Sequence, residues 1–157
     1  MTTLEALEQQ ALDNDIHLLT RKLPCKGLYY AYPEDGLYTI TLSSGLDTDC
    51  ERCTVLAEEL GHHHTAPVDL FLSSRCVQSA CERSAAAWAV NALLPPEKLI
   101  RAWRAGAQDP WELAEYCDVT HQFAVRAMEL YAERYNDGII LDGYLITFDL
   151  LHIREVV

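Results

Sequence analysis

The spacing of apolar and polar residues predicts an N-terminal helix followed by a small sheet. Apolar residues recur at helical spacing behind Thr2 and Thr3, which can cap a helix, and they predict a helix over 3–14. A short apolar run predicts a strand at 16–19. Residues 27–42 carry aromatic and β-branched side chains on both sides of a Glu-Asp-Gly turn, which predicts a β-hairpin.

The rest of the chain has mostly helical periodicity, interrupted by proline, glycine and aspartate. Helices are predicted at about 49–63, 75–93, 97–105, 111–117 and 122–135. Asp47, Thr48 and Asp49 are alternative caps for the first of these helices. The apolar, alternating segment 139–148 predicts a terminal hairpin or edge strand. Together the patterns predict an α+β fold, mostly helical with a small antiparallel sheet.

Length and charge limit the classes of protein that need to be considered. A chain of 157 residues suits one compact domain over 1–157, with 109–157 as its C-terminal subregion. The formal net charge of -12 and the absence of a basic stripe argue against direct binding to nucleic acid. The helix pair over 109–135 has the length of a helix-turn-helix, and we interpret it as a packing or partner-docking element. No apolar run approaches the ~20 residues of a membrane span, and the N-terminus lacks a signal-peptide pattern, so we expect a cytoplasmic protein.

The cysteines offer an alternative metal site, which their spacing does not favour. Six cysteines without a signal peptide are expected to be reduced thiols. Cys50 and Cys53 have metal-ligand spacing, and Cys76 and Cys81 could complete a four-sulfur zinc site. The second pair is spaced less suitably and lies in a helical pattern, so we interpret Cys53 as a buried apolar residue.

The most informative stretch is Leu-Ala-Glu-Glu-Leu-Gly-His-His-His-Thr at 56–65, within a predicted helix. It resembles the zincin motif, in which two histidines four residues apart bind zinc and a glutamate beside the first is the general base. Glu59 and His62 match the base and the second histidine of the motif. Glu58 replaces its first histidine. Glu58 and His62 share a helix face, and Glu59 lies about 100° around the helix at the edge of that face. A carboxylate and an imidazole could therefore bind one metal ion, with Glu59 taking a proton from water.

Such a site needs a third ligand, and several alternatives stay open. Glu82, flanked by alanines that permit a close helix crossing, is the best candidate, and Asp69 is a second. Glu59 and His63 are also four residues apart and could form a register-shifted site. A solvated helix face without metal remains the simpler interpretation of the motif alone. His63 or His64 is expected to cap the helix end. We interpret the isolated histidines as surface or core residues: His17, His121 and His152.

Several motifs together resemble the ImmA/IrrE family of metallo-endopeptidases, in a branch from phages and mobile elements that has glutamate at the first motif position. The similarity covers about 15–135 and includes, besides 56–65, the segments Lys26-Gly-Leu-Tyr-Tyr30, Glu82-Arg-Ser-Ala-Ala-Ala-Trp-Ala89 and 111–119. The resemblance implies a small gluzincin-like zincin fold and a cytoplasmic zinc peptidase that inactivates a helix-turn-helix repressor. It implies that Glu59 is the general base and that Glu58, His62 and Glu82 are metal ligands. Because Glu58 replaces a histidine, manganese or iron are alternatives to zinc.

Two functions of different classes follow from the sequence. The first is a metal-dependent endopeptidase that cleaves or inactivates a helix-turn-helix repressor, whose basic surface the acidic chain would attract. The second is a non-catalytic antirepressor that binds and sequesters a transcriptional regulator. The filled general-base and ligand positions favour the first.

Overall fold

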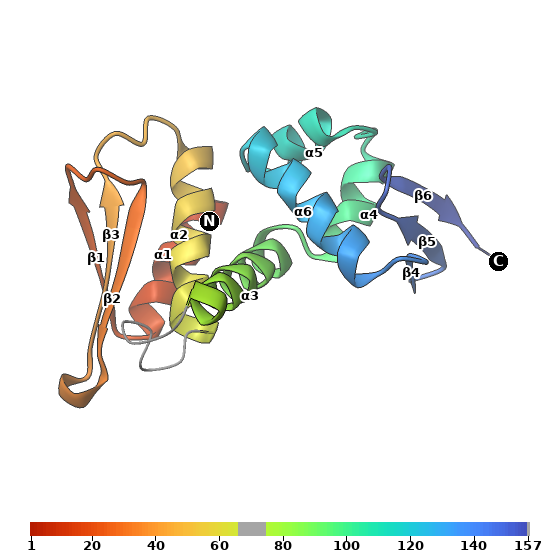
Figure 1. The fold of residues 1–157 in the computed structure, drawn as a ribbon. Coiled ribbons are helices and arrows are strands. Elements are labelled where there is room, and N and C mark those ends of the chain that lie inside the picture. The colour runs from red at the N-terminus through yellow and green to blue at the C-terminus, as the bar shows by residue number, and fades with distance from the viewer. Residues whose placement is uncertain (66–74, 157) are drawn as a thin grey trace. The chain divides into compact units, whose positions relative to one another are not determined.

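The computed structural model describes residues 1–65 and 75–156 (Figure 1). The chain forms two compact units, Met1–Ala89 and Val90–Val157, and each is described by itself. Asp69, the second candidate for a third ligand, lies outside the described residues. One helix, α3 (Arg75–Leu93), begins in the first unit and ends in the second. The α+β class predicted from the periodicity is confirmed.

The first unit contains a three-stranded sheet with helices on one side. Its other elements are α1 (Thr3–Asp13), β1 (Ile16–Arg21), β2 (Gly27–Tyr32), the 3-10 turn η1 (Pro33–Asp35), β3 (Leu37–Ser43) and α2 (Asp49–Thr65). The predicted hairpin is the antiparallel pair β2–β3, and β1 pairs in parallel with the other edge of β3, giving the order β1-β3-β2. The sheet is therefore mixed, because β3 rather than β2 lies beside β1. Strand β2 is left at an edge.

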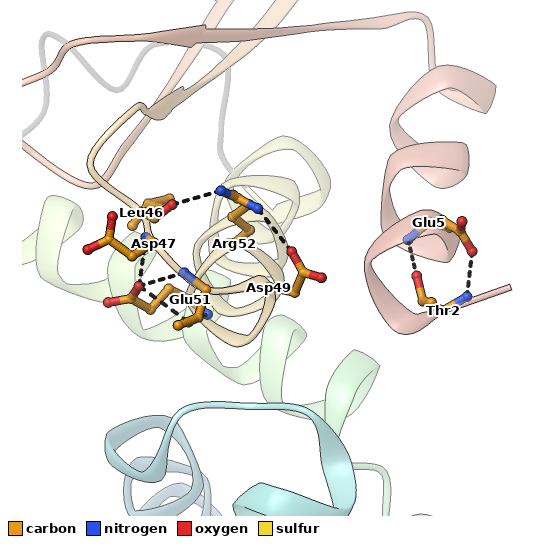
Figure 2. A network of polar contacts seen from close by, with 8 residues as sticks. Thr2, Glu5, Leu46, Asp47, Asp49, Glu51 and Arg52 are labelled. Atoms are coloured by element: carbon orange, nitrogen blue, oxygen red, sulfur yellow. Dashed lines mark hydrogen bonds and ion pairs between the residues drawn. The ribbon is translucent and has the colours of Figure 1, made fainter.

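Side-chain hydrogen bonds hold the first turns of α1 and α2 (Figure 2). The hydroxyl of Thr2 accepts from the backbone of Glu5, whose carboxylate accepts from the backbone of Thr2. The same reciprocal arrangement begins α2, where the Thr48 hydroxyl accepts from the backbone of Glu51, and the Glu51 carboxylate accepts from the backbone N–H of Thr48. Of the three predicted caps, Thr48 is the one used. Because this pattern satisfies otherwise unpaired N–H groups, it sets where α2 begins and hence which residues share its faces.

Helices α1 and α2 lie on the same side of the sheet (Figure 1). The buried side of α2 is apolar over its middle turns, with Leu56 and Leu60 almost completely enclosed. Ile40 of β3 is also fully buried and lies in the centre of the sheet. Cys53 on the same helix is buried, which confirms its interpretation as an apolar core residue. This core holds α2 firmly against the sheet.

The second unit contains three helices and a small sheet besides the end of α3. These elements are α4 (Pro96–Arg104), α5 (Pro110–Cys117), α6 (His121–Arg134), β4 (Ile139–Leu141), β5 (Tyr144–Thr147) and β6 (His152–Glu155). The predicted terminal hairpin is β4–β5, and β6 adds a third antiparallel strand that the sequence pattern did not indicate. Only Ile153 of β6 is buried, so the strand lacks an alternating pattern long enough to recognise.

Helices α5 and α6 pack against each other, as the helix-turn-helix length suggested. The Asp109 carboxylate accepts from the backbone of Trp111 and Glu112, and the Thr120 hydroxyl caps α6. No helix among the described residues is long and apolar enough to cross a membrane.

Candidate functional site

The candidate site is built on the last turns of α2, where a buried apolar face meets a polar one. Leu60 and Gly61 are buried, whereas Glu58, Glu59 and His62 are half-buried. The helix thus presents two carboxylates and one imidazole at the margin of the core, on the faces that the spacing predicts. Because they are half-buried, these groups remain accessible to a metal ion or a substrate, but they have lost part of their hydration.

Helix α3 brings a further carboxylate to His62. The Nε2 atom of His62 lies 3.4 Å from Oε2 of Glu82, and the two side chains are 18% and 73% exposed. The helices approach closely at Gly61, where a Cβ atom would collide with the backbone carbonyl of Ala85. A glycine and the alanine-rich segment of α3 therefore allow the close crossing that the sequence predicts, and this crossing places Glu82 beside His62.

The carboxylates of the site interact with one another, and burial makes both glutamates of α2 harder to ionise. Burial, followed by the charges of Glu58 and Glu82, raises the pKa of Glu59 to about 7, against a small lowering by a hydrogen bond from the Tyr29 backbone. Burial also raises the pKa of Glu58, which the charge of Lys26 lowers and that of Glu82 raises. A cation placed among these groups would relieve the repulsion between them.

Tyr29 of β2 contacts the site from the sheet, and the sequence did not single it out as a site residue. Its hydroxyl lies 2.9 Å from Nδ1 of His63, and its backbone N–H hydrogen-bonds the Glu59 carboxylate. Burial, with a smaller effect of Tyr38, raises the pKa of Tyr29 to about 12. The signal for Tyr29 was its position in the segment 26–30, which the family resemblance includes, but a strand pattern does not show which residue faces a helix.

The rings of His63 and His64 pack against aromatic side chains, and the helix cap expected from one of them would involve residues beyond Thr65 that the structure does not describe. The His63 ring meets Tyr29 and Tyr38 edge to face, and the His64 ring stacks on Trp88 at 4.6 Å between centroids. Burial lowers the pKa of both histidines, and for His63 the neighbouring His64 adds to the effect. Nδ1 of His63 is engaged with the Tyr29 hydroxyl, and this contact gives the register-shifted pair Glu59–His63 no support.

The isolated histidines and the cysteines do not add to the site. His17 and His152 are exposed. His121 stacks on Trp111 at 3.5 Å between ring centroids. Cys81 is buried, and the side chain of Cys76 lies outside the described residues.

Two donor atoms of the site, on His62 and Glu82, are spaced as ligands of one divalent metal ion. Ligands of a tetrahedral zinc ion at about 2.0–2.2 Å from the metal are about 3.4 Å apart, which is the separation between His62 and Glu82. Glu58 is the candidate for a third ligand, since it precedes His62 by one helical turn and lies on the same helix face. Among the side chains that the structure describes, no group of three from histidine, cysteine, aspartate or glutamate could hold a metal ion. Closing the site on a metal would therefore require Glu58 to turn toward the His62–Glu82 pair.

The His62–Glu82 contact can be tested through its two expected effects. Glu82→Gln is expected to change the free energy of unfolding of the metal-free protein by less than about 1 kcal/mol, because pairs this exposed are screened by water. If Glu82 is a ligand, the same change is expected to lower the affinity for zinc by at least 10-fold, since it would remove an anionic donor. Chemical denaturation in chelator and a zinc titration measure the two effects separately. A large loss of stability with unchanged zinc affinity would contradict this assignment.

Comparison with known protein families identifies the chain. The model of the family Peptidase_M78, described as the IrrE N-terminal-like domain, matches residues 11–129. A comparison with curated proteins found no match. The matched segment includes α2 and α3 with the residues of the candidate site, and a metallopeptidase family implies a metal cofactor. Because this segment covers most of the chain, the protein belongs to the ImmA/IrrE family of metallopeptidase domains.

Proposed function

We propose that this protein is a metal-dependent endopeptidase that cleaves a helix-turn-helix repressor of a phage or mobile element. The observation that carries the proposal is the contact between His62 and Glu82, which joins two helices beside the motif glutamates Glu58 and Glu59. An exposed carboxylate gains little stability from such a contact, so a ligand role explains its position better than a structural one.

Glu58, His62 and Glu82 would hold the metal. Two carboxylates and one imidazole suit zinc and also harder ions, so manganese and iron are alternatives. When bound, the metal supplies a Lewis acid that polarises the peptide carbonyl and makes water more acidic. The residues of the chain orient this chemistry, and Glu58 makes the site more anionic than one with two histidines.

Glu59 would move the proton. A carboxyl group whose pKa is about 7 is ionised in a substantial fraction of molecules at neutral pH and can both accept and release a proton. In the proposed reaction, Glu59 takes a proton from water as the water oxygen attacks the peptide carbonyl carbon. Glu59 then returns a proton to the amide nitrogen as the C–N bond breaks. Its hydrogen bond from Tyr29 keeps the carboxylate oriented between these two steps.

The charge of the protein supports a basic protein substrate. With a formal net charge of -12, the chain repels DNA and attracts a protein that carries a DNA-binding surface. This attraction would raise the rate of encounter and would weaken as ionic strength rises. It accounts for recruitment, whereas the bond that is cleaved would depend on local contacts.

A non-catalytic antirepressor is the second candidate function. It is favoured by the lack of a three-ligand group among the side chains that the structure describes, together with glutamate in place of the first motif histidine. In this function the acidic surface would bind and sequester the regulator. Such a protein needs no metal and no general base.

The deciding experiment incubates the purified protein with a helix-turn-helix repressor encoded beside its gene, after loading with zinc, manganese or iron. We expect cleavage that chelator abolishes and that His62→Ala lowers by at least 10²-fold, because the substitution removes a ligand. Mass spectrometry of the products locates the cleaved bond. Tight binding of the repressor without cleavage under all metal conditions would reject the peptidase and support the antirepressor.

A further inference from the structure

We propose that Gly27 is a positioning residue for Glu59, because its missing side chain lets the edge strand β2 hold the Glu59 carboxylate through the backbone of Tyr29. This inference rests on the proposed function, in which Glu59 moves the proton. It assigns a role to a residue outside the metal-binding motif and on a different element of the fold.

The hydrogen-bonding pattern of the hairpin shows why the Tyr29 backbone is available. The Ser43 N–H donates to the Lys26 carbonyl at 2.8 Å, next to the first paired residues of β2 and β3. Bonded pairs alternate along an antiparallel ladder, so the residues of β2 that bond β3 are 28 and 30. The N–H of Tyr29 therefore points away from β3, at the edge of the sheet. The Glu59 carboxylate provides its partner.

Gly27 lies two residues before Tyr29 and so faces the same side of the sheet, toward α2. A Cβ atom on Gly27 would lie 2.5 Å from Cγ1 of Val55, 2.7 Å from Oε1 of Glu59 and 3.0 Å from its Cγ. Distances below 3.0 Å are essentially never seen for real Cβ atoms, so a side chain at this position would force a shift. The close approach of β2 to α2 thus depends on glycine.

Space, rather than backbone conformation, is what requires glycine here. The glycines with positive φ in the described chain are Gly36, Gly106, Gly138 and Gly143. Gly27 is not among them, so its backbone conformation would accept an alanine. The cost of a side chain at Gly27 would therefore come from its contacts with Val55 and Glu59.

Of these two neighbours, Glu59 is the one that can move. Val55 is buried in the core, whereas the Glu59 oxygen is the end of a flexible, half-buried side chain. A methyl group on Gly27 would displace the carboxylate and weaken its hydrogen bond from Tyr29. The Glu59 carboxylate would therefore lose its orientation. This loss should lower the rate of the chemical step more than it lowers the affinity for substrate.

The activity test compares Gly27→Ala with Gly45→Ala as a matched control. A Cβ atom on Gly45 meets only Oγ of Ser43, at 3.6 Å, so this variant should behave as wild type. We expect Gly27→Ala to lower kcat by roughly 10²-fold with KM changed less than about 3-fold, as for a misplaced catalytic group. Wild-type kcat in a folded Gly27→Ala protein would overturn the proposal.

A second substitution separates positioning from packing. Gly27→Ala with Val55→Ala removes the contact between the new methyl group and Val55 but keeps its contact with Glu59. If Gly27 matters only for packing, the double variant should recover activity along with the core. We expect kcat to stay low in the double variant, and recovery to the level of Val55→Ala alone would overturn the proposal.

Hydrogen exchange of backbone amides tests the same inference without any catalysis. In metal-free wild type the Tyr29 amide should be protected by Glu59, and in Gly27→Ala it should exchange at least 10-fold faster. The Tyr30 amide, which faces β3, should not change and serves as the internal control. Unchanged protection of Tyr29 in Gly27→Ala would reject the positioning role, even if wild type cleaves no substrate. Absence of cleavage in wild type would instead reject the proposed function.

Discussion

Glu59→Gln is expected to lower the rate of repressor cleavage by about 10²–10⁴-fold, the usual contribution of a positioned general base. Glutamine has nearly the same shape as glutamate, and its carbonyl oxygen can still accept the hydrogen bond from the Tyr29 backbone. It cannot accept and release a proton at neutral pH. The change should therefore fall on kcat, while zinc content and repressor binding stay close to wild type. Cleavage by this variant within about 3-fold of wild type would exclude Glu59 as the base.

The stability of the same variant provides the control for folding and has a definite sign. Burial raises the pKa of folded Glu59 from 4.5 to about 7, so the folded state holds a proton that the unfolded state releases as pH rises between these values. In chelator, wild type should thus lose stability from about pH 4.5 to 7, by an amount on the order of 1–3 kcal/mol. Glu59→Gln should lose less over this range and be more stable than wild type at pH 8. Parallel urea denaturation of both proteins at pH 5 and pH 8 measures the difference.

Gly61→Ala is expected to destabilise the protein by about 1–3 kcal/mol, the usual cost of overpacking a close contact. Alanine favours a helix over glycine by roughly 1 kcal/mol, so helix propensity alone predicts the opposite sign. The methyl group would meet the backbone carbonyl of Ala85, which cannot rotate away as a side chain can. Helix α3 must then shift from α2, and the separation of His62 from Glu82 should increase.

Two measurements distinguish this effect from a general loss of packing. Urea denaturation in chelator gives the change in the free energy of unfolding, and a zinc titration at a temperature where both proteins are folded gives the change in affinity. We expect zinc affinity to fall at least 10-fold, because ligand geometry depends on the crossing. An increase in stability with unchanged affinity would show that α3 does not need glycine at this crossing.

The local elements could be predicted from sequence because their signals lie within a few residues. The spacing of apolar positions predicted α2 and α3, and Thr48 was among the residues expected to cap α2. The helical repeat alone places Glu58 and His62 on one face. Strand β6 was missed because a single buried residue, Ile153, does not make an alternating pattern. The parallel pairing of β1 with β3 was not predicted, since strands separated in sequence carry no local sign of their partners.

The helices and strands of the first unit, the helix face that carries Glu58 and His62, and the order of family motifs could all be recognised from local patterns. Which distant groups meet on that face follows from the packing of the folded chain. This packing brings Glu82 to His62 and the Tyr29 backbone to Glu59, and it needs Gly27 and Gly61 for space. The physical reason is that helical periodicity depends on neighbours three or four residues away, whereas these contacts depend on how closely β2 and α3 pack against α2.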